Sequence, residues 1–127
     1  MSYKRYKKFL ERLQYQSSPT YSCMLYEREG ISADEFIEAT YSNKCFQVLH
    51  NVCGESVKED YGDWDLEHFM TLDEENTKLL MLRTGTHDGA GLIKEIEKRF
   101  APAGYLAKKK IEDFCKAKGI TYSEHCY

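Results

Sequence analysis

Helical periodicity in the last third of the chain is the feature that most restricts its fold. Apolar residues within 92–100 recur at spacings of three and four, which predicts an amphipathic helix beginning near Asp88. Pro102 must end this helix, because the residue before a proline disfavours helical backbone. The same spacing predicts a second helix over about 103–118, with Gly119 as its terminator.

The middle of the chain mixes strand and helix patterns. The run TYSCMLYER at 20–28 is β-prone and predicts a strand. Ser32 followed three residues later by Glu35 has the form of a capping box. Together with the apolar spacing that follows, it predicts a helix over 32–54, which Ser42–Asn43 can interrupt and Gly54 ends.

Two further segments are predicted to be β-structure. Residues 64–85 have two apolar runs that flank the polar segment 73–76, and we interpret them as a β-hairpin with its turn at 73–76. The alternating tail, 120–127, predicts a last edge strand.

These elements place the chain in the α+β class. Residues 3–15 carry one apolar helical stripe, so residues 1–19 are expected to form an N-terminal helical extension of a single domain, 1–127. A content of 42% hydrophobic and 31% charged residues fits a globular protein. We predict two layers, an antiparallel sheet with helices packed on it. The element order without the first helix, βαββα(α)β, resembles a ferredoxin-like βαββαβ arrangement.

Charge is distributed unevenly along the sequence. Residues 1–13 hold five basic and one acidic residue, 27–75 hold three basic and fourteen acidic, and 78–127 hold ten basic and six acidic. An acidic middle repels nucleic acid and membranes and attracts basic proteins. A solvated face without a partner explains the same pattern and is the slightly stronger interpretation.

The first functional hypothesis is a small acidic binding or inhibitor protein. An acidic surface can occupy the basic site of an enzyme that acts on nucleic acid, as immunity proteins do with nuclease toxins. The likeness to immunity proteins is one of length and charge only, because no motif supports it. Aromatic anchors with an acidic rim would form the contact; the expected partner-binding residues are Glu59, Asp60, Tyr61, Asp63, Trp64, Asp65, Glu67, Glu74 and Glu75.

The alternative hypothesis is a domain or enzyme that binds a nucleotide or phosphate in the loop Arg83–Gly91. A glycine-rich junction that opens a helix presents free N–H groups to an anion. The expected ligand-binding residues are Arg83, Thr84, Thr86, His87, Gly89 and Gly91. The loop matches no phosphate-binding signature, and Asp88 would repel an anion. An ordinary turn with Asp88 or Thr86 as the helix cap is therefore the stronger interpretation.

Other classes of function have less support. His50 and Cys53 are three residues apart and His125 and Cys126 could complete a zinc set with them, but a second spaced pair is lacking, so neither a metal nor another cofactor is expected. No hydrolase motif is present, and a Cys–His nucleophilic pair stays open because nothing distinguishes one cysteine from another. Nucleic-acid binding is disfavoured by the net charge of −3.

The expected setting follows from the ends of the chain and its cysteines. We expect no membrane partner and a cytoplasmic location, since the five cysteines are odd in number and no secretion signal is visible. An edge strand and ten tyrosines would allow a homodimer.

Overall fold

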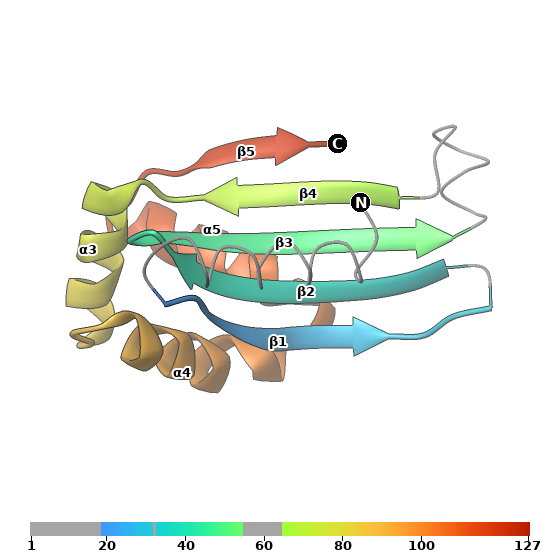
Figure 1. Cartoon of the computed structure of the whole chain (residues 1–127), viewed down its shortest axis with the longest axis horizontal. Helices are drawn as coiled ribbons and strands as arrows, with labels where there is room; N and C mark the ends of the chain where they lie inside the picture. Colours follow the sequence, from blue (N-terminus) through green and yellow to red (C-terminus); the bar gives the residue numbers. More distant parts are fainter. Residues whose placement is uncertain (1–18, 32, 55–64) are drawn as a thin grey trace.

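Five antiparallel strands form one sheet in the order β1-β2-β3-β4-β5 (Figure 1). The computed structural model describes residues 19–31, 33–54 and 65–127. The strands are β1 (Tyr21–Arg28), β2 (Ala33–Ser42), β3 (Cys45–Gly54), β4 (Asp65–Thr71) and β5 (Ser123–Cys126). The predicted strand at 20–28 and the predicted edge strand in the tail are both confirmed.

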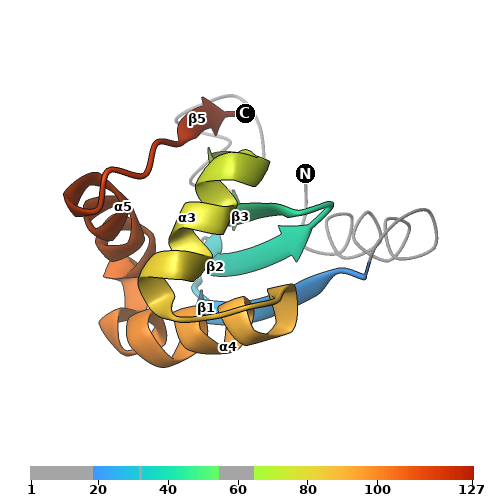
Figure 2. The same cartoon turned by 90° about the vertical axis from the view of Figure 1, so that its left-hand side faces the viewer.

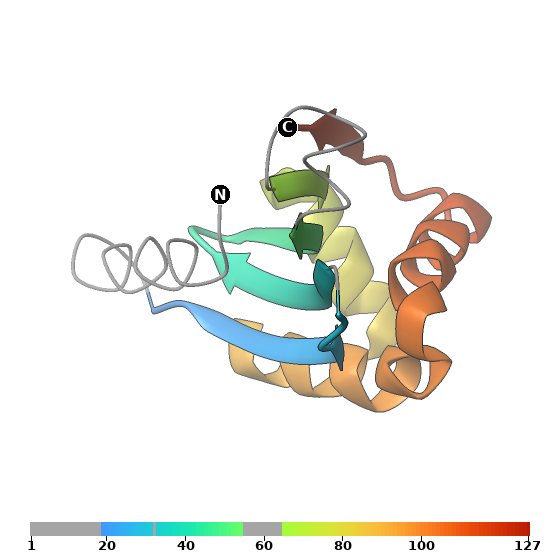
Figure 3. The ribbon, with the colours of Figure 1, turned by 90° about the vertical axis from the view of Figure 1, so that its right-hand side faces the viewer.

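The helices pack on one face of this sheet (Figures 2 and 3). They are α3 (Glu74–Thr84), α4 (Gly89–Phe100) and α5 (Ala107–Ala117), with the 3-10 turn η1 (Ala101–Leu106) between α4 and α5. The prediction of a two-layer α+β fold is therefore confirmed. The ferredoxin-like order is not what the described residues adopt, because the segment expected to be its first crossover helix forms β2 and β3, and the sheet order is β1-β2-β3-β4-β5. The predicted N-terminal helix, 3–15, lies outside the described residues.

The predicted helix over 32–54 is wrong, because this segment is the hairpin of β2 and β3. The turn residues Asn43 and Lys44 have φ angles of 52° and 65°, and two such residues form the two-residue turn that matches the twist of a hairpin. Ser32 lies outside the described residues. Glu35, the other residue of the expected capping box, lies in β2. Its Oε2 accepts a hydrogen bond from Nε2 of His50 in β3 at 3.0 Å.

The second strand of the predicted 64–85 hairpin is also wrong, because residues 74–84 form α3. Asp73 is the N-cap of this helix, and its carboxylate accepts a hydrogen bond from the Asn76 N–H at 2.8 Å. Gly85, with φ 71°, closes the helix in the left-handed conformation that glycine adopts without strain. The residues expected to turn a hairpin therefore begin a helix.

The two helices predicted after Asp88 are confirmed. Asp88 caps α4, and Pro102 lies in the 3-10 turn that separates α4 from α5. At the end of α5, the N–H of Ile120 donates to the Cys115 carbonyl at 2.9 Å, and Gly119 has φ 71°. The helix therefore stops as the sequence predicted.

The main core lies between the sheet and the helices. Its fully buried members include Ile37, Ala39, Phe46, Val48, Met70 and Leu72 from the sheet side and Leu80, Leu92, Ile96 and Ile111 from the helices. Phe36 and Leu49 alternate with these strand residues and form a second buried cluster with Met24 and Phe69. Both faces of the central strands therefore carry buried apolar residues.

Candidate functional site

The first turn of α3 presents carboxylates at the surface. Asp73, Glu74 and Glu75 are all exposed. The backbone N–H of Asn76, which donates to the Asp73 carboxylate, holds the pKa of Asp73 below its usual value. Lys44 and Lys78 approach one oxygen of Glu74 at 3.8 and 3.5 Å, and exposed pairs at such distances interact weakly. This helix end is consequently an acidic surface that is only partly neutralised.

The structure divides the other expected partner-binding residues. Asp65 begins β4, and Glu67 on the same strand is buried, with 4% of its surface exposed. Glu67 is thus not brought to the surface beside Glu74 and Glu75. The remaining five, Glu59, Asp60, Tyr61, Asp63 and Trp64, lie outside the described residues.

Two leucines on the outer side of α3 extend the acidic turn. Leu79 and Leu82 are 38% and 71% exposed. With Glu75 they are spaced four and three residues apart, so the three side chains form one stripe along the helix. We call Glu75, Leu79 and Leu82 the outer stripe. Thr77, Leu80 and Thr84 are the buried residues of the same helix.

Sequence reasoning missed the two leucines because it treated residues 77–85 as a strand. In a strand, Leu79 would share a face with Met81 and Leu82 with Leu80. In a helix, Leu79 and Leu82 fall on the same side. The signal that could have found them is the helix boundary itself, namely Asp73 before two glutamates and Gly85 after the last turn.

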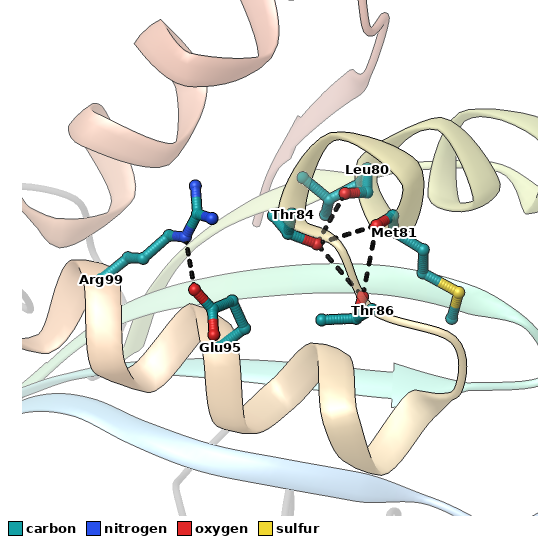
Figure 4. A network of polar contacts seen from close by, with 6 residues as sticks. All are labelled: Leu80, Met81, Thr84, Thr86, Glu95 and Arg99. Carbon is teal, nitrogen blue, oxygen red and sulfur yellow. Dashed lines mark hydrogen bonds and ion pairs between the residues drawn. The ribbon is translucent and has the colours of Figure 1, made fainter.

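The hydroxyl groups of the predicted ligand loop are used within the protein. Thr84 Oγ1 donates to the Leu80 carbonyl at 2.8 Å and lies 3.1 Å from Thr86 Oγ1. Thr86 Oγ1 in turn reaches the Met81 carbonyl at 3.5 Å. Figure 4 shows this network at the end of α3, with both threonine hydroxyls turned toward the helix carbonyls. Arg83 is exposed on the last turn of the same helix.

The start of α4 already holds a carboxylate. Asp88 accepts a hydrogen bond from the Gly91 N–H at 2.7 Å, which satisfies one of the free amides that an anion would seek. Gly89 is buried, and a methyl group at this position would lie only 2.3 Å from Cδ1 of the Tyr41 ring. Close packing against Tyr41 therefore accounts for this glycine without a ligand.

A cavity of about 410 Å³ lies between the start of α4, the side of α3 and the turn that joins β2 to β3. Its lining residues are Tyr41, Lys44, Glu74, Thr77, Lys78, Met81, His87, Asp88 and Gly89. It thus brings together two of the six predicted ligand-binding residues, His87 and Gly89. Arg83, Thr84, Thr86 and Gly91 are not part of its lining.

The cavity lining carries charges of both signs. Lys44 and Lys78 provide cations, and Glu74 and Asp88 provide carboxylates. Burial, followed by the nearby Glu74 carboxylate, raises the pKa of Tyr41. Its phenol therefore stays protonated and can donate a hydrogen bond into the cavity.

Metal-binding clusters and membrane spans can be assessed over residues 19–31, 33–54 and 65–127. No group of three or more His, Cys, Asp or Glu side chains in these ranges is placed to hold a metal ion. None of the helices in the same part of the chain combines the length and the apolar character needed to cross a membrane.

Comparison of the chain with family models, with curated proteins and with solved structures finds no match. We therefore infer function from the side chains and their geometry.

Proposed function

We propose that this protein is a small binding or inhibitor protein that docks the outer side of α3 on a basic partner protein. The observation that carries the proposal is the exposure of Leu79 and Leu82 directly after three surface carboxylates, Asp73, Glu74 and Glu75. Apolar side chains that lose water on contact supply affinity. Carboxylates beside them supply orientation and a fast approach to a basic surface.

The size of this surface indicates what else the contact needs. A helix of 11 residues is about 16 Å long, whereas a stable interface buries about 800 Å² on each partner. One face of α3 is smaller than that, so further residues must contribute. Segment 55–64 joins the ends of β3 and β4 that lie opposite α3 (Figure 1), so the remainder must come from residues nearer to α3.

The partner class follows from the chemistry of the surface. Enzymes that cut or bind nucleic acid carry basic sites that hold phosphates, and a row of carboxylates can occupy such a site. We therefore favour a nuclease or another nucleic-acid-acting protein as the partner. Binding of this kind has no requirement for catalysis by the chain itself.

A photo-crosslinking experiment tests the proposal in the cells that produce the protein. A photoreactive phenylalanine derivative replaces Leu82 in one variant and the exposed Lys98 of α4 in a matched control. We expect one protein to be crosslinked from position 82 and not from position 98. An excess of the untagged wild type should reduce this crosslinking, whereas the same excess of untagged Glu75→Lys should not. Equal capture from both positions, or equal competition by both untagged proteins, would overturn the proposal.

Measurements with the purified partner then test the inhibitor role. Glu75→Lys should slow association, and the wild-type rate should fall steeply with added salt. Leu82→Asp should mainly speed dissociation, because it removes an apolar anchor. Addition of the chain should also reduce the partner's activity on nucleic acid, and an unaffected activity would contradict an inhibitor.

The cavity supports a second candidate function, binding of a small phosphate-bearing ligand. Lys44, Lys78 and His87 would contact the phosphate, and the Tyr41 phenol would donate to it. A nucleotide at a hundred times its dissociation constant should stabilise the fold by about 2.7 kcal/mol. A thermal-shift screen should show this rise in the wild type and its loss in Lys78→Ala, while Arg83→Ala should behave as the wild type.

A further inference from the structure

Cys126 differs from the other four cysteines in its exposure. It is exposed, Cys23, Cys45 and Cys53 are partly buried, and Cys115 is buried. Burial is the main cause that raises the pKa of Cys23 to about 12 and that of Cys115 to about 11. Those two thiols are therefore inert at neutral pH, because the thiolate is the nucleophile.

A histidine lies beside this exposed thiol. Residues Cys126 of β5 and His68 of β4 are directly paired in the antiparallel register, which places their side chains on the same side of the sheet. The distance from Cys126 Sγ to His68 Nε2 is 3.9 Å, so the imidazole can receive the thiol proton. The two residues are 58 positions apart in the sequence.

An open cavity of about 200 Å³ adjoins the pair and gives a reactant access to the sulfur. Both His68 and Cys126 line it, together with Phe69, Lys108, Glu124 and His125. A small molecule that enters this cavity meets the thiol and its base together. The geometry is that of a nucleophile with an adjacent general base.

The surroundings of His68 keep its ring neutral near pH 7. Burial, followed by the charges of Lys108 on α5 and of His50 on β3, lowers the pKa of His68 below its usual 6.5. Glu124 of β5 and Glu112 of α5 act in the opposite direction but do not outweigh them. A neutral imidazole can accept a proton, whereas a protonated one cannot.

We propose that Cys126 is a nucleophilic thiol, with His68 as its general base, and that it captures low-molecular-weight disulfides as a mixed disulfide. The thiol proton passes to His68 Nε2 while the sulfur attacks one sulfur of the disulfide. The S–S bond of the reactant breaks as the new S–S bond forms. The leaving thiolate takes the proton from His68 and departs as a thiol, so Cys126 is oxidised and half of the reactant is reduced.

Rates of modification in the full chain test this proposal. The folded protein is treated with iodoacetamide, and the alkylation of each cysteine is followed by mass spectrometry. Cys126 should react at least about tenfold faster than Cys45 or Cys53, and His68→Ala should remove about tenfold of its rate. His87→Ala is the matched control, because it removes an exposed imidazole that does not line this cavity and should leave the rate at Cys126 unchanged.

A pH profile separates a base from a residue that only supports the strand. The rate at Cys126 should fall in acid as His68 becomes protonated, and this step should vanish in His68→Gln, which fills similar space without a base. Circular dichroism confirms that each variant is folded. An unchanged rate and an unchanged acid step in both His68 variants would overturn the role of the histidine.

Oxidised glutathione is the probe for disulfide capture. The wild type should gain one glutathione on Cys126 and release one glutathione thiol per adduct, and the reductant dithiothreitol should reverse the modification. Failure to form this adduct would overturn disulfide capture. Modification of Cys45 or Cys53 in preference to Cys126 would overturn the assignment of the reactive thiol.

Discussion

Substitution of Gly89 by alanine tests whether packing or ligand binding explains the glycine at the start of α4. The new methyl would lie 2.3 and 2.5 Å from Cδ1 and Cε1 of Tyr41 and 3.0 Å from Cδ2 of Tyr21. Carbon atoms in contact are normally about 3.5–4.0 Å apart. One ring or the helix must therefore move by about 1 Å or more.

The size of the effect follows from two opposing terms. Overpacking of this kind costs about 1–3 kcal/mol, and the cavity beside Tyr41 gives its ring space to move, which favours the lower half of that range. Alanine has a helix propensity more favourable than that of glycine by up to about 1 kcal/mol. The gain is smaller at the first helical position, where Gly89 lies. We expect Gly89→Ala to lower the free energy of unfolding by about 1 kcal/mol.

A double-mutant cycle with Tyr41→Ala isolates the contact. Without the ring, Gly89→Ala should be neutral or stabilising by about 0.5 kcal/mol, which gives a coupling energy of about 1.5 kcal/mol. Urea unfolding of the four proteins measures each term. If Gly89→Ala is as stable as the wild type, or has the same effect with and without the Tyr41 ring, the packing argument is refuted.

Four further substitutions test the fold. Lys44→Gly should raise the free energy of unfolding, measured by urea denaturation, by about 0.5 kcal/mol. The reason is that an Asn-Gly pair suits a turn with two positive φ angles. A loss of stability would contradict the assigned turn. Leu80→Ala should lower the free energy of unfolding by about 3 kcal/mol, because the Leu80 side chain is fully buried. Leu82→Ala should change it by no more than about 0.5 kcal/mol. Similar losses of stability in the two variants would refute the assignment of Leu80 to the buried face of α3. Asp73→Ala should lower the melting temperature at neutral pH. The difference in melting temperature between the wild type and Asp73→Ala should shrink as pH falls below 3.8, the usual pKa of an aspartate. A carboxylate whose pKa is lowered by folding stabilises the fold above that pH, and the stabilisation is lost when the group is protonated. A difference that does not change with pH would show that the charge of Asp73 does not contribute to the cap.

The helices that the sequence predicted correctly have one buried face and clear ends. In α4, Leu92 and Ile96 are buried, Asp88 marks the start and Pro102 lies beyond the end. The segment at 33–54 has no such asymmetry. Phe36 and Ile37 are adjacent in β2 and both are buried. A strand buried on two faces loses the alternation by which strands are recognised, and its apolar residues then fit a helical spacing by chance.

Contacts between distant segments set the limit of prediction for the candidate sites. The pairing of His68 with Cys126 depends on the register of β4 and β5, in which Phe69 pairs with His125. A shift by one residue would turn the thiol to the other side of the sheet. No local pattern around Cys126 specifies that register, so the sequence could list the cysteines and histidines but could not pair them.

The way α3 is held favours its use as a docking surface. Thr77 Oγ1 accepts a hydrogen bond from the Phe46 N–H of β3 at 3.0 Å, and Asn76 Oδ1 accepts one from the Thr121 N–H at 2.9 Å. Thr84 and Thr86 close the other end of the helix. A helix fixed at both ends loses little conformational entropy when a partner binds it, so more of the contact energy is retained as affinity. The exposed Leu79 and Leu82 are therefore presented on a rigid element, which is the arrangement that a binding surface requires.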